Sequence, residues 1–101
     1  MSSSPNRTFV VPDEVPLLLL ADALVQSLAV LNLADPANEP RAEAERVLLA
    51  AALQGRRQVV LPVGADKLLT ELAASRLVHC IVGGREDEAA SWFVMWRALK
   101  S

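Results

Sequence analysis

The run from Leu17 to Ala34 is the feature that most restricts how this chain can fold. It is 18 residues long, and 14 of them are Leu, Ala or Val. Asp13 precedes it as a candidate N-cap, so we expect a helix from there to about Leu33. Asp22 and Gln26 lie one turn apart and form a narrow polar stripe, whereas the other faces are apolar. Such a helix is either the central helix of a fold or one half of an interface.

The same run does not have the composition of a membrane span or of a signal peptide. A spanning helix needs about 20 residues nearly free of polar groups, and Gln26 and Ser27 lie near the middle of this run. A signal peptide has a basic segment directly before its apolar core, and here Asp13 and Glu14 stand in that place. We therefore expect a soluble, cytoplasmic protein that does not enter the membrane.

The chain is short for the number of apolar side chains that it carries. It has 101 residues, the size of one domain, and 52% of them are apolar. A domain of this size buries only about 60–70% of the surface that its unfolded chain exposes. Residues 1–7 are rich in serine and lack periodicity, so we expect a disordered leader followed by one domain over residues 8–101. The bias toward Ala, Leu and Arg is compatible with a bacterial or phage source.

The remaining segments alternate between helical and strand-like patterns. This alternation predicts an α+β fold with three helices and a small antiparallel or mixed sheet. Short β-branched runs that end at prolines predict strands, and Gly55 after a helical pattern predicts a helix end. The predicted strands are residues 8–11 and 58–63, and the predicted helices are residues 13–33, 40–54 and 64–75.

The C-terminal segment leaves two alternatives open. Residues 86–100 have helical spacing, with acidic residues at the start and Lys100 at the end, as the helix dipole favours. The block at residues 92–96 is also typical of a strand, and residues 77–82 are rich in β-branched side chains. In the strand alternative, residues 77–82 and 91–98 form a hairpin. We favour the hairpin over the helix because the two strand-like blocks lie opposite one another.

Residues of catalytic or metal-binding type are too few to make a site. Cys80 is the only cysteine and His79 the only histidine, which excludes an internal disulfide and a multi-cysteine zinc site. Neighbours on a strand point to opposite faces, so these two residues cannot form a catalytic dyad with each other. We expect Cys80 to be buried, we expect no cofactor and no metal, and an enzyme is the least favoured class.

The charge distribution gives weak support for nucleic-acid binding. Residues 1–50 hold three basic and seven acidic groups, a net of −4, whereas residues 51–101 hold seven basic and five acidic groups, a net of +2. With the hairpin, residues 64–98 resemble the recognition helix and wing of a winged-helix domain, although a strand stands where that family has another helix. The resemblance implies DNA binding. The candidate contact residues are Arg56, Arg57, Lys67, Arg76 and Arg85.

Surplus apolar surface is therefore the main functional signal. A helix that is apolar on nearly all sides, together with two tryptophans, exceeds what one small core needs, and large aromatic side chains are favoured at interfaces. We expect a non-enzymatic interaction protein: a small regulator, adaptor or inhibitor that binds another protein and self-associates as a homodimer. A winged-helix-like transcription regulator is the alternative. The candidate interface residues are Leu20, Leu24, Leu28, Leu31, Trp92 and Trp96.

Overall fold

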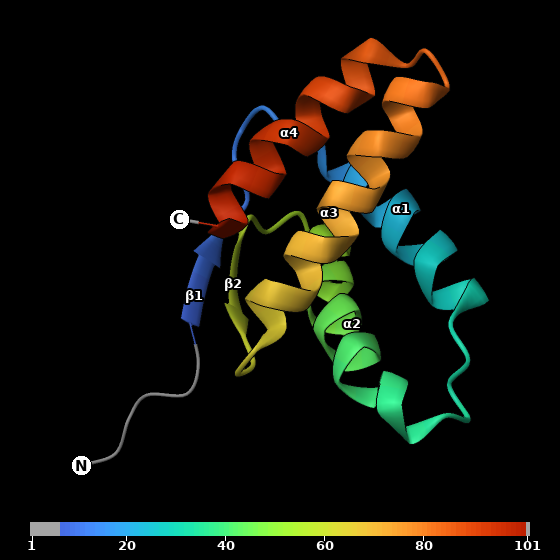
Figure 1. Ribbon diagram of the computed structural model, residues 1–101. Coiled ribbons are helices and arrows are strands. Elements are labelled where there is room, and N and C mark those ends of the chain that lie inside the picture. Colours follow the sequence, from blue (N-terminus) through green and yellow to red (C-terminus); the bar gives the residue numbers. More distant parts are fainter. Residues whose placement is uncertain (1–6, 101) are drawn as a thin grey trace.

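A two-stranded antiparallel sheet lies at one side of the molecule (Figure 1). The computed structural model describes residues 7–100. Strand β1 (Arg7–Val10) pairs with β2 (Gln58–Leu61), and Phe9 stands opposite Val59. The alternation along both strands sends these two side chains into the core. Of the leader predicted over residues 1–7, residues 1–6 lie outside the described residues, and Arg7 belongs to β1.

Four α-helices make up most of the described chain and confirm the α+β class, with one helix more than predicted. They are α1 (Leu17–Val30), α2 (Glu39–Leu53), α3 (Ala65–Val82) and α4 (Glu86–Lys100), and a 3₁₀ turn at Pro36–Asn38 precedes α2. Helix α1 packs against α2, α3 packs against α4, and α2 joins the two pairs through α3. The turn between α3 and α4 lies at the end of this helix pair that is remote from the sheet (Figure 1).

Helix α1 begins later and ends earlier than predicted. Asp13 is not its N-cap, because residues 12–15 form a turn and the helix starts only after Pro16, which is extended with ψ 133°. At the other end Leu31 is extended. The side chain of Asn32 accepts a hydrogen bond from the backbone of residue 34 at 3.2 Å, which favours a turn over a further helical residue.

The predicted C-terminal hairpin is wrong, because the chain is helical on both sides of Gly83 and Gly84. Gly84 adopts φ +75°, the left-handed conformation that commonly ends helices. The backbone N–H of Arg85 donates to the carbonyl of Cys80 at 2.9 Å, which closes the end of α3. The next helix starts at once, and the carbonyl of Arg85 accepts from the N–H of Ala89 at 2.9 Å. The two glycines therefore connect antiparallel helices.

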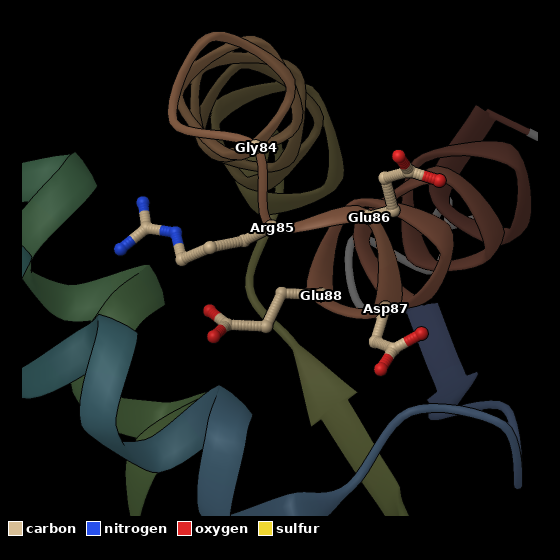
Figure 2. Close-up of a pocket in the computed structure, with 5 residues that line it drawn as sticks. All are labelled: Gly84, Arg85, Glu86, Asp87 and Glu88. Atoms are coloured by element: carbon tan, nitrogen blue, oxygen red, sulfur yellow. The ribbon is translucent and has the colours of Figure 1, made fainter.

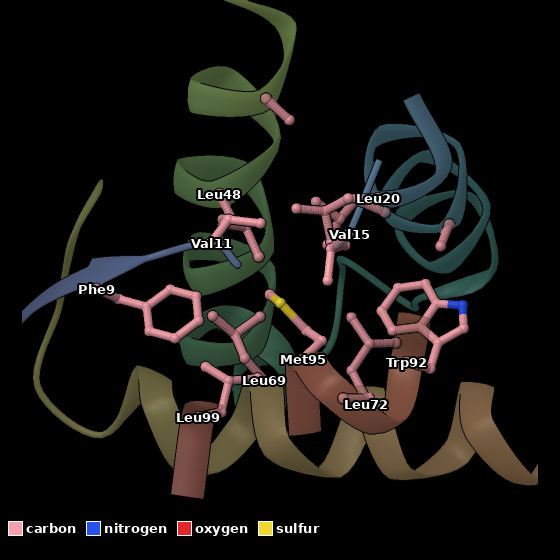
Figure 3. Close-up of a cluster of buried hydrophobic side chains, with 14 of the residues drawn as sticks. Phe9, Val11, Val15, Leu20, Leu48, Leu69, Leu72, Trp92, Met95 and Leu99 are labelled. Carbon is pink, nitrogen blue, oxygen red and sulfur yellow. The ribbon is translucent and has the colours of Figure 1, made fainter. Parts of the chain in front are cut away.

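The core lies between the four helices and the inner face of the sheet (Figure 3). Three predicted interface residues, Leu20, Leu24 and Trp92, belong to it, each with at most 1% of its surface exposed. These three assignments are wrong for the folded chain, because its own helices cover them. Cys80 is also buried, as predicted. Large core side chains include Phe9, Leu20, Leu24, Leu48, Leu61, Leu69, Leu72, Trp92, Met95 and Leu99, together with Val11 and Val15.

Candidate interaction surface

The basic residues that we selected from the sequence do not form one patch. Arg56 lies in the turn between α2 and β2, Lys67 in the first turn of α3, and Arg85 beyond the other end of α3. At 1.5 Å of rise per residue, the part of α3 from Lys67 to Val82 is about 22 Å long, and Arg85 lies beyond its end. A duplex contact that uses all of them from one face is therefore not supported.

Two of the selected arginines have structural roles. Arg57 donates from Nη1 to the backbone carbonyl oxygens of Pro12 and Val15, at 2.6 and 2.8 Å. These bonds tie the start of β2 to the connection between β1 and α1. Arg76 donates from Nη2 to the side chain of Gln26 on α1 at 3.3 Å. Helix α4 stands where the wing was predicted, and two of the selected arginines bond within the chain. The winged-helix interpretation therefore loses its structural basis.

The residues of catalytic type also stay apart. Cys80 faces the core from α3, and His79 is exposed on the same helix. Within residues 7–100, no group of three or more His, Cys, Asp or Glu side chains is placed to hold a metal ion. The described helices also include none that is both long and apolar enough to cross a membrane.

A hollow of about 340 Å³ at the tip of the α3–α4 pair is lined by four charged residues. Their side chains do not point toward a common ligand position. Figure 2 shows that Arg85 and Glu88 point to one side, whereas Glu86 and Asp87 point away from them. The three acids occupy the first turn of α4, where the helix dipole favours negative charge.

An apolar groove lies beside this tip, between α3 and α4. It has a volume of about 700 Å³. Glu86, close to the tip, is its one charged lining residue. The residues that line it are Leu77, Ile81, Gly84, Glu86, Ala89, Ala90 and Phe93.

Two of the side chains that line the groove are exposed to solvent, and so is Val82, which follows Ile81 in the chain. Ile81 is 62% exposed, Val82 is 83% exposed, and Phe93 is 44% exposed. Phe93 stacks on Trp96 with ring centroids 6.0 Å apart. Exposed apolar side chains that lie together, as Ile81 and Phe93 do in this groove, are typical of a binding surface. Single exposed apolar side chains are ordinary on protein surfaces.

Helix α1 has exposed apolar side chains as well, but they are interrupted. Leu18 and Val25 are 85% and 51% exposed, and Asp22 lies between them on the same face. Asp22 accepts a hydrogen bond from Gln26 at 2.9 Å, so the polar stripe predicted from the sequence is present. This stripe divides the apolar surface of α1, whereas the groove between α3 and α4 is lined mainly by apolar side chains.

The sequence pointed to part of this surface. Trp96 was selected and lies beside the groove, half-buried against Phe93, whereas Leu28 and Leu31 are half-buried on α1. Ile81 was missed because residues 77–82 were assigned to a strand. The signal that could have found it is the helical spacing of Ala65, Leu69, Leu72, Ala73 and Cys80, which continues through that segment.

Comparison with protein-family models, with curated proteins and with solved structures found no match to this chain.

Proposed function

We propose that this protein is a non-enzymatic interaction protein, a small regulator or adaptor that acts by binding protein through the face formed by α3 and α4. The observation that carries the proposal is the apolar groove together with the exposed side chains of Ile81 and Phe93 beside it. Burying an exposed aliphatic or aromatic side chain contributes about 1.5–3 kcal/mol, so a few such residues can supply most of a binding free energy.

The shape and chemistry of the groove favour an apolar helix as its ligand. Two antiparallel helices form its walls, and a third helix can lie along them with its own apolar stripe facing inward. Glu86 at the end of the groove favours a basic group at the matching end of the ligand.

The test is affinity capture from a lysate of the source organism with three versions of the chain. Wild type, Ile81→Asp and Leu53→Asp are immobilised in parallel, and the captured proteins are quantified by mass spectrometry. Leu53 is a matched control, because it is 69% exposed, aliphatic and in the last turn of a helix, as Ile81 is. Both substitutions therefore add the same charge at a similar place in a helix.

We expect at least one protein to bind wild type and the Leu53→Asp variant but not the Ile81→Asp variant. That protein, once purified, should bind wild type directly, and Ile81→Asp should weaken the affinity at least tenfold, since a charge is then buried in an apolar contact. Equal capture by all three versions would contradict the proposal.

A further inference from the structure

The outer face of α4 carries opposite charges at equal distances along the chain from Phe93. Glu86 lies seven residues before Phe93, and Lys100 lies seven residues after it. At 1.5 Å of rise per residue, the Cα atoms of Glu86 and Lys100 stand about 10 Å to either side of the Cα atom of Phe93.

These residues share one side of the helix. Seven residues are close to two full turns, so Glu86, Phe93 and Lys100 follow one stripe along α4, and all three are exposed. Lys100 Nζ stands 4.4 Å from the centroid of the Trp96 ring, and Trp96 stacks on Phe93. The positive charge is thus held on the same face as the aromatic pair.

We propose that this face binds a second copy of the chain, with the two α4 helices antiparallel and a two-fold axis at Phe93. The inference depends on the proposed role of the α3–α4 face as a protein-binding surface, and it names the occupant. In a two-fold contact each pairing occurs twice. Glu86 then lies beside Lys100 of the partner subunit.

Charge selects this arrangement over a parallel one. A parallel pair of helices would place Glu86 beside Glu86 of the partner subunit and Lys100 beside Lys100 of the partner subunit, and like charges in contact are unfavourable. The antiparallel pair places opposite charges together at both ends.

Charge exchange within one chain tests the arrangement. Glu86→Lys, Lys100→Glu and the double variant are compared with wild type by sedimentation equilibrium of the purified proteins. Residues 86 and 100 are about 21 Å apart along α4, so they cannot pair within one chain. We expect each single variant to weaken the dimer about tenfold, because two exposed pairs change from attraction to repulsion. The double variant should recover the wild-type Kd to within about threefold.

A loss of helix stability cannot imitate this recovery. Lys at the N-terminus and Glu at the C-terminus of α4 both oppose the helix dipole, so the double variant has the least stable helix of the set. Thermal unfolding followed by circular dichroism should therefore rank the double variant lowest, while its dimer affinity is restored. A double variant that associates no better than the single variants would overturn the inference.

A variant at the axis gives an independent measurement. Phe93→Asp should abolish the dimer, whereas Leu53→Asp should leave it intact. A wild-type chain that stays monomeric up to about 1 mM would overturn the inference. If such a monomer still captures a protein through Ile81, the proposed function stands and only the second copy is wrong. If it captures none, the proposed function fails as well.

Discussion

Arg57 offers a sharp test of how the sheet is attached to the helices. Its guanidinium bonds to two backbone carbonyls that lie 42 and 45 residues earlier in the chain. Replacing Arg57 by Met keeps the length of the side chain and removes both hydrogen bonds. Arg56→Met removes the same charge at the adjacent position, where the side chain is exposed and donates to the side chain of Gln54.

The expected cost follows from those two bonds. A hydrogen bond from a charged donor contributes about 1.5–3 kcal/mol. The Arg57 side chain is 30% exposed, and water can reach part of the site, so we lower the sum to about 2–3 kcal/mol. The contact with Asp13, at 3.6 Å, adds little because the Asp13 side chain is 99% exposed.

Urea unfolding followed by tryptophan fluorescence measures this cost, because Trp92 is buried in the folded chain and becomes exposed to water on unfolding. With a urea m-value of about 1.5 kcal/mol/M, Arg57→Met should lower the midpoint by about 1–2 M. Arg56→Met should lower it by less than about 0.3 M. If the two variants had the same midpoint, Arg57 would not hold the sheet connection and the reasoning would be refuted.

Three further changes have outcomes that follow from the structure. Gly84→Ala should lower the free energy of unfolding by about 1–2 kcal/mol, because an L-residue is strained at φ +75°, and Gly84→Asn should lower it less; equal urea midpoints would contradict this. Trp92→Ala should cost about 3–5 kcal/mol and Trp96→Ala clearly less, since only the first empties the core; the reverse order in urea unfolding would count against the core described. Arg41→Ala should cost about 2–3 kcal/mol because it leaves the buried Glu45 carboxylate without its ion pair, whereas Glu45→Met should be neutral or stabilising. Thermal unfolding of both variants checks this last pair, and a strongly destabilised Glu45→Met would refute it.

Helix α3 shows why composition alone misled the prediction of the C-terminal half. Val78, Ile81 and Val82 are β-branched and favour strands locally. In the folded chain they lie on the exposed side of a helix, while Leu72, Ala73 and Cys80 face the core with helical spacing. Burial of that stripe against α4 outweighs the weak local preference.

Helix α1 shows a different limit. Its existence was predicted correctly from one long apolar run, but the same run hides which face is buried, because a nearly uniform helix has no contrast between its sides. Leu20 and Leu24 are buried while Leu18 and Val25 are exposed. That distinction depends on where α2 packs, which no short-range pattern contains.

The role of Arg57 could not be predicted for a related reason. Its partners are main-chain oxygens far away in sequence, and these carry no residue-type signal. The groove could not be predicted either, since it exists only because α3 and α4 are both helical and lie side by side. The strands at residues 8–11 and 58–63, in contrast, follow from local β-branched runs and prolines, and the structure places both within a few residues of the prediction.

Disulfide trapping at the two-fold axis measures whether two copies of the chain meet at Phe93. Packed helices 8–10 Å apart, with Cα atoms 2.3 Å from each axis, place facing Cα atoms about 4–5 Å apart, close to disulfide geometry. Phe93→Cys is compared with Leu53→Cys under the same mild oxidation, and the native Cys80 is buried in both. We expect rapid formation of a covalent dimer for Phe93→Cys and little for Leu53→Cys. Equal and slow cross-linking of both variants would contradict it.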